Sequence, residues 1–201
     1  MNTTKTLLIA LAAIVTTATP SRRAEELSKA RPVVLLNAGT DKNGLTAAEP
    51  KTNMESVDNT PWIKPAENKP FTIQAVGTPS QYGTWTQYSF TFVPKADGYV
   101  WLVLAGQYKG AGMTTDPKVD FEDVSYAGTS AAVNGDFEKI GATGTVDGWK
   151  FAKAALPVGS EAANSGKSFV TVDANNSAGQ SVKVTAGQPV TVSFSARSHK
   201  D

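Results

Sequence analysis

Carboxylates gather at two places in the second half of this chain. Asp120, Glu122 and Asp123 lie within the string VDFEDV, and Asp136 and Glu138 lie within NGDFE. A glycosidase needs two carboxyl groups that face each other across a cleft, and within the predicted domain, residues 32–201, the sequence offers no further acidic cluster. We therefore expect these carboxylates to have a role other than catalysis.

The sequence contains few residues that could serve other kinds of catalysis. The single histidine, His199, lies in a polar stretch near the last residue and is expected to be solvent-exposed, and no Ser-His-Asp set can be built without it. The GxSxG elbow of hydrolases is absent. Because the chain has no cysteine, cysteine nucleophiles and zinc–thiolate sites are excluded. The sequence predicts a protein that is not an enzyme.

Three aromatic residues stand among turn-forming residues instead of in a strand pattern. They are Trp62 in NTPWIKP, Tyr82 in SQYGTW and Tyr108 in GQYKG. Because sugar rings stack on exposed aromatic faces, these three predict a ligand-binding surface; the alternative is that they fold back onto the domain. Trp85 and Trp101 follow apolar strand patterns and are expected in the core.

The elements that must position these residues are strands. Period-two alternation is found at 71–76, 85–93, 118–126, 167–174, 180–186 and 188–198, and short apolar runs are found at 32–38 and 99–106. Helical periodicity is absent after residue 31, and many short strands at about ten-residue spacing indicate an all-β sandwich or barrel. The stretch 39–70, with four prolines, is expected to be a long loop.

Alternation within 118–126 makes a definite prediction about the acidic residues. It places Phe121 and Asp123 on one face of the strand, and Glu122 and Val124 on the other.

The last third of the chain resembles the N-terminal half of a carbohydrate-binding module of the four/nine/twenty-two type, a galactose-binding-like β-jelly roll. The matching strings are NGDFE (134–138), GW (148–149), SGKSFVTV (165–172) and GQSVKVTAGQPVTVSFSAR (179–197). Residues 85–126, with WTQYSFTFVPKADGYVWLVLAG and then VDFEDVSY, resemble the C-terminal half of the same module. The resemblance implies a β-sandwich jelly roll that binds carbohydrate and does not catalyse.

The resemblance also implies a structural calcium ion. In that family a Glu of the opening strand and an Asp of the closing strand share calcium, and the matching positions here are Glu138 and Asp123, with Asp136 and Glu122 as neighbours. Calcium takes six to eight oxygen ligands from carboxylates and carbonyls. The alternative is a solvated acidic strand end.

The order of the two halves departs from the family, because the opening strands come last. One interpretation is a single, circularly permuted jelly roll over 32–201, in which 32–127 supplies the second half and 133–201 the first. It predicts that strand 188–197 neighbours strand 32–37 and that Asp123 lies near Glu138. The other interpretation is a piece of a tandem array of modules.

The first residues and the net charge of the chain bear on where the protein is located and which partners it binds. Residues 1–18 have the pattern of a secretory signal peptide, with Lys5 before the apolar run LLIALAAIV, and 19–31 form a polar linker. The protein is therefore expected to be secreted (extracellular, periplasmic or at a cell surface), with no membrane span. A formal net charge of +1 gives no electrostatic support for nucleic-acid binding.

Two functions follow from these patterns. The first is a secreted, non-catalytic module that binds a polysaccharide or other glycan. The second is a structural or adhesion module that binds a protein partner, or a fragment of a tandem-module surface protein. An exposed aromatic platform beside Asn, Gln or Asp favours the first, and a flat apolar patch or an unpaired strand edge favours the second.

Overall fold

The structure is a computed structural model that describes residues 30–40, 42, 54–56, 63–65, 72–77, 83–109, 113–142, 144–152, 157–159 and 163–199. Trp62, Tyr82 and the predicted signal peptide lie outside the described residues. Within the described ranges no helix is long and apolar enough to cross a bilayer.

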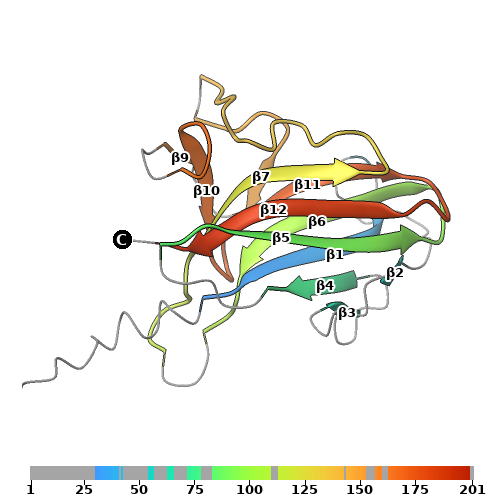
Figure 1. Ribbon diagram of the computed structural model, residues 1–201, viewed down its shortest axis with the longest axis horizontal. Coiled ribbons are helices and arrows are strands. Elements are labelled where there is room, and N and C mark those ends of the chain that lie inside the picture. Colours follow the sequence, from blue (N-terminus) through green and yellow to red (C-terminus); the bar gives the residue numbers. More distant parts are fainter. Residues whose placement is uncertain are drawn as a thin grey trace, which may run out of the picture.

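The described residues form twelve strands and no helix (Figure 1). The strands are β1 (Pro32–Thr40), β2 (Met54–Ser56), β3 (Ile63–Pro65), β4 (Thr72–Val76), β5 (Thr86–Pro94), β6 (Gly98–Gly106), β7 (Val119–Ala127), β8 (Lys150–Ala152), β9 (Pro157–Gly159), β10 (Ser168–Val172), β11 (Ser177–Val184) and β12 (Val190–Ser198). Two of them, β2 and β3, interrupt the stretch that was expected to be one long loop.

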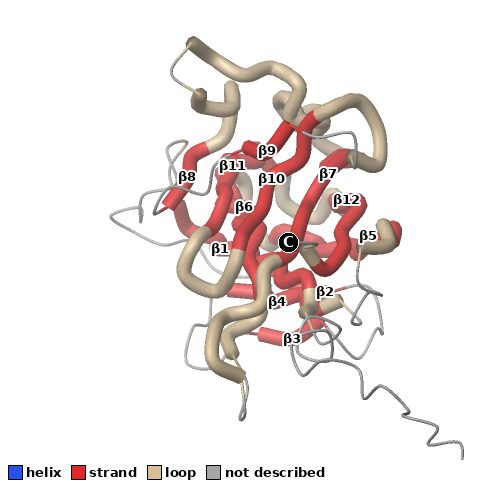
Figure 2. Tube along the Cα trace, turned by 90° about the vertical axis from the view of Figure 1, so that its left-hand side faces the viewer, coloured by secondary structure: helices blue, strands red, loops and turns tan. Residues whose placement is uncertain are grey.

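The strands form two antiparallel sheets that face each other, so the predicted all-β sandwich is confirmed. Sheet A has the order β3-β4-β1-β6-β11-β8, and sheet B has the order β2-β5-β12-β7-β10-β9. Figure 2 views the molecule along the strands and shows the two sheets as two layers. The described strands at the edges of both sheets have three residues each.

The core lies between the sheets and follows from strand alternation. From sheet B, Phe90, Phe92 and Phe194 point inward, and from sheet A, Leu102 and Leu104 do so; each is at most 2% exposed. Full burial of such side chains stabilises the fold by about 1.5–3 kcal/mol each. Trp149, in the GW string, is also buried, against Phe137, with its indole N–H donating to the carbonyls of Val133 and Asn134.

A β-bulge in β7 changes the predicted faces of the acidic strand. Ser193 pairs with Ser125 and Ser195 with Glu122, so Asp123 and Val124 oppose a single residue of β12. Asp123 has a φ of 53°, the left-handed conformation that a bulge of this kind requires. The extra residue shifts the alternation by one, so Phe121 and Val124 both enter the core, and the prediction that they lie on opposite faces was wrong.

The two halves of the sequence interleave in both sheets. In sheet A, β11 pairs with β6, and in sheet B, β12 lies between β5 and β7. The strands predicted to be neighbours, β12 and β1, lie in different sheets and do not pair with each other. Their segments meet where Ser198 Oγ lies 3.5 Å from the carbonyl oxygen of Ala30.

Candidate functional site

The most exposed large hydrophobic side chain among the described residues is Tyr108, at 64% exposure. It follows β6, and it lines a pocket of about 470 Å³ on the outer face of sheet A. The lining residues of this Tyr108 pocket are Arg31, Val33, Leu35, Ala105, Gly106, Gln107, Tyr108 and Ala174. The pocket combines an apolar floor from β1 and β6 with an aromatic ring at its mouth.

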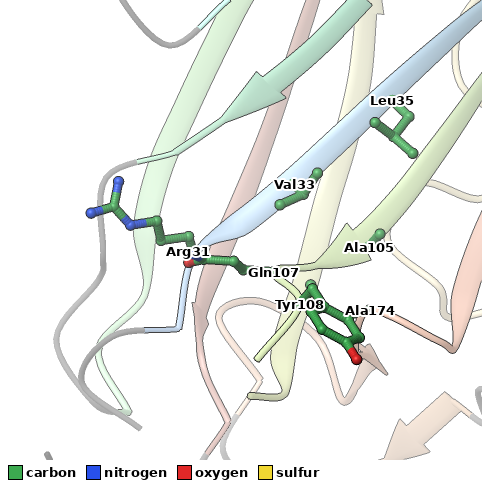
Figure 3. Close-up of a pocket in the computed structure, with 8 residues that line it drawn as sticks. Arg31, Val33, Leu35, Ala105, Gln107, Tyr108 and Ala174 are labelled. Carbon is green, nitrogen blue, oxygen red and sulfur yellow. The ribbon is translucent and has the colours of Figure 1, made fainter. Parts of the chain in front are cut away.

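Strand alternation explains why the floor is apolar. Val34, Leu36 and Leu104 point into the core, so Val33, Leu35 and Ala105 must point to the outer face. Pairing of β1 with β6 brings these three side chains together, and Figure 3 shows them along the two strands, with Tyr108 beyond the end of β6.

Polar groups hold the loops on either side of Tyr108. Asp116 Oδ1 accepts a hydrogen bond of 2.8 Å from the Lys109 amide, and its Oδ2 accepts one from Asn175 Nδ2. Asp173 in turn accepts hydrogen bonds from the amides of Asn175 and Asn176. Hydrogen bonds of Asp116 therefore connect the residue after Tyr108 to Asn175.

A second aromatic side chain lies on the same outer face, further along β6. Trp101 is half-buried, not in the core as expected, and it lies directly over Gly179 of β11. A Cβ on Gly179 would come within 2.4 Å of the indole ring, so only glycine permits this contact. Lys150 Nζ lies 5.7 Å from the ring centroid on the same side of the sheet.

Three of the four predicted metal residues, Glu122, Asp123 and Glu138, bind one segment, NSGKS (164–168). Glu122 is fully buried and accepts hydrogen bonds from the amides of Asn164 and Ser165, both 2.6 Å, and from Ser165 Oγ. Asp123 accepts hydrogen bonds from Asn164 Nδ2 and Ser165 Oγ. The carboxylates thus bind the segment through its own donors.

Glu138 holds the other end of the same segment. Its Oε1 accepts hydrogen bonds from the amides of Lys167 (2.6 Å) and Ser168 (2.8 Å). Gly166 has a φ of 57°, and a Cβ there would come within 2.3 Å of Glu138 Oε1. Asp136 is exposed, and its Oδ1 lies 3.4 Å from the Glu138 amide. Asp123 and Glu138 therefore bind opposite ends of the same five-residue segment. Among the described residues, no three acidic or histidine side chains form a group suited to a metal ion.

The electrostatics of Glu122 follow from its position. Burial raises the pKa of its carboxyl above the usual value, and Asp123 adds to this effect, whereas the hydrogen bonds from Asn164 and Ser165 oppose it. Desolvation disfavours the charged form of a carboxyl group even where it is well hydrogen-bonded.

Sequence reasoning missed a buried ionic cluster beside the NSGKS segment. Asp120, fully buried on β7, accepts hydrogen bonds from Arg197 Nε (2.9 Å) and Thr171 Oγ1 (2.7 Å), and its Oδ1 lies 2.7 Å from His199 Nδ1. The predicted exposure of His199 was therefore wrong, because its side chain is only 17% exposed. Adjacent registers of β10, β7 and β12 bring Thr171, Asp120 and Arg197 into one row.

Aromatic rings cover this ionic cluster. The Arg197 guanidinium lies 4.4 Å from the Trp85 ring centroid and 4.9 Å from that of Phe169, and the two rings meet edge to face. Trp85 is thus half-buried over the outer face of sheet B and is not part of the core, contrary to expectation. In the sequence, the alternation of Asp120 with Phe121 and of Arg197 with Ala196 indicates that both charged residues lie on the face opposite the core, but not that they are buried there.

No protein-family model matches this chain, and comparisons with curated proteins and with solved structures likewise found no match. The function therefore has to be argued from the geometry of the sites.

Proposed function

We propose that this protein is a secreted, non-catalytic β-sandwich that binds a polysaccharide or other glycan, with Tyr108 stacking on a sugar ring. The observation that carries the proposal is the 64% exposure of Tyr108 at the mouth of an apolar-floored pocket. An exposed ring gains from covering the apolar face of a sugar, and buried pockets with a few polar groups are the usual form of small-ligand sites.

The polar groups beside Tyr108 support a sugar over a protein partner. Gln107 lines the pocket, and Asn175 and Asp116 hold the adjoining loops. The side-chain amide of Gln107 matches the hydroxyl groups of a sugar. The alternative of an adhesion module has less support, since the described edge strands are only three residues long, which is how proteins avoid edge-to-edge pairing.

The test is a polysaccharide pull-down followed by titration of any bound glycan with three variants. Tyr108→Ala should weaken binding about tenfold or more. The variant loses the burial of the apolar ring surface and, in addition, the stacking of the ring, which is worth roughly 0.5–1.5 kcal/mol. Tyr108→Phe should retain most of the affinity. Ile140→Ala, which removes another exposed apolar side chain, is the matched control and should change nothing. Equal affinity for the wild type and Tyr108→Ala would contradict the assignment.

We also infer that the sandwich is a circularly permuted jelly roll, in which the strands of the ordinary order continue from β12 to β1. Traced from β10 through β11 and β12 to β1 and on to β7, the chain places four central strands in each sheet, β4-β1-β6-β11 and β5-β12-β7-β10. The contact between Ser198 and Ala30 supports the same inference. A rearranged chain that joins 199 to 30 by a short linker and opens within 129–132 should fold with unchanged strand content; an unfolded product would contradict it.

Calcium at the NSGKS segment is a separate proposal. It is supported by the convergence of Asp123 and Glu138 on one short segment, and Glu122 and Asp136 stand beside them. An ion that binds only the folded state stabilises it by about 2.7 kcal/mol at a hundredfold excess over the dissociation constant. The measurement is the melting temperature in calcium and in chelator, for the wild type and Glu138→Gln. A melting temperature that does not respond to calcium in the wild type contradicts the proposal.

A further inference from the structure

The charge of the Tyr108 pocket is carried by a single side chain. Among the eight lining residues only Arg31 is ionised, and it is exposed. Arg31 forms no ion pair with another residue of the described chain, unlike Arg197, whose guanidinium is bound to Asp120. Asp116, the carboxylate that holds the Tyr108 loop, is not part of the lining, and both of its oxygens accept hydrogen bonds.

The arrangement of the pocket sets the length of a ligand that uses both groups. Figure 3 shows Tyr108 and the Arg31 guanidinium at opposite ends, with Val33 and Gln107 between them. A ligand that contacts both Tyr108 and Arg31 must therefore extend across the apolar floor between them, which favours a chain of sugar units over a single one.

From this geometry we propose that the pocket selects an acidic polysaccharide, with the carboxylate of a hexuronate unit on Arg31 and a neighbouring ring on Tyr108. The inference rests on the proposed carbohydrate binding and names its ligand class. A carboxylate matches the planar fork of a guanidinium through two parallel hydrogen bonds. The positive charge of Arg31, which forms no ion pair within the described residues, stands at one end of a lining that is otherwise uncharged and is the complement of that group.

The experiment compares three polymers on the full chain by isothermal titration. The probes are polygalacturonate, its fully methyl-esterified form, which keeps the rings and removes the charge, and dextran sulfate, which carries sulfate in place of carboxylate. Polygalacturonate should bind about tenfold more tightly than the ester, in line with the worth of a charge-assisted hydrogen bond. Arg31→Gln should abolish that difference, and Arg31→Lys should restore part of it. Lys139→Gln, the same charge change on an exposed loop residue, is the control and should preserve it.

The outcomes separate the two proposals. Equal affinity for polygalacturonate and its ester, with binding that still depends on Tyr108, overturns the acidic ligand and leaves carbohydrate binding standing. Tighter, Arg31-dependent binding of dextran sulfate overturns the carboxylate assignment. An equal loss from Lys139→Gln shows nonspecific charge attraction and overturns the role of Arg31. Absence of binding to every polymer of a broad neutral and acidic panel overturns the proposed function as well.

Discussion

The outer faces of the two sheets differ in a way that strand alternation alone does not reveal. On sheet B the outward residues Asp120, Glu122 and Arg197 are charged, yet each is at most 5% exposed. On sheet A the outward residues Val33 and Leu35 are apolar and line the Tyr108 pocket, where the exposed apolar surface is the Tyr108 ring, at 64% exposure. Buried charge and exposed apolar surface are the two informative departures from the ordinary distribution, and this sandwich shows one on each side.

The difference indicates separate roles for the two faces. Every described carboxylate in the buried part of sheet B has hydrogen-bond donors from the NSGKS segment, Thr171 or Arg197, as a buried charge requires. The aromatic ring of Tyr108, in contrast, is largely exposed. These hydrogen bonds indicate that the outer face of sheet B holds the fold together, whereas the ligand binding proposed above concerns the outer face of sheet A.

The sharpest test of this contrast is Arg197→Met, which removes the guanidinium and leaves Asp120 buried. Breaking a buried ion pair from one side typically costs about 3–5 kcal/mol, so the free energy of unfolding measured in denaturant should fall by that amount. Lys183→Met removes the same charge from an exposed position on β11 and should stay within about 0.5 kcal/mol of the wild type. Similar losses for both variants would show that the buried pair has no special part in stability.

Trp85→Ala and Tyr108→Ala compare an aromatic ring from each face. Trp85 packs on Phe169 and Arg197, so its removal should lower stability by about 2–4 kcal/mol, somewhat less than for a fully buried ring, and leave glycan affinity unchanged. Tyr108→Ala should do the reverse. Thermal melts and ligand titrations of both variants decide the matter, and a Tyr108→Ala variant that unfolds would place that ring in the packing of the fold.

Glu122→Gln tests how the NSGKS segment is held, through pH. Because the pKa of Glu122 is raised on folding, the native state binds its proton more tightly than the unfolded state does. This contribution to stability is present below the unfolded pKa, near 4.5, and is lost as pH rises through the higher folded value. The variant should lack this decline.

At neutral pH we expect Glu122→Gln to lower the stability of the fold. Its amide group faces the N–H donors of Asn164 or Ser165, and one unmatched buried group costs about 1–3 kcal/mol. Stability curves of the two proteins from pH 3 to 8 give the measurement, and parallel curves would contradict the raised pKa.

The smallest expected effect concerns a buried hydroxyl group that has no hydrogen-bond partner among the described residues. The Tyr126 hydroxyl is buried against the core without a hydrogen-bond partner among the described residues, and burial raises the pKa of its phenol. Tyr126→Phe removes the unsatisfied group and keeps the ring, so stability should rise by up to about 1 kcal/mol. A loss of stability would mean that the hydroxyl has a partner.

Local pattern was enough to predict the class of fold and much of the core. Alternation in 85–93 placed Phe90 and Phe92 on one face of a strand, and in the structure both are buried, because a row of apolar side chains is driven to the core face whichever strands lie beside it. The turn residues around Tyr108 likewise predicted its exposure. These properties depend on a few neighbouring residues, which is why the sequence by itself determined them.

Tertiary structure decided what depends on partners far along the chain. The bulge at Asp123 exists because β7 and β12 pair out of step by one residue, and it moves Val124 into the core beside Phe121. Burial of Arg197, and of His199 near the end of the chain, depends on Asp120, which is 77 positions away from Arg197. Trp85 and Trp101 look alike in the sequence, yet one covers an ion pair and the other lies over Gly179. A strand pattern tells which residues share a face, and only the pairing of distant strands decides what covers that face.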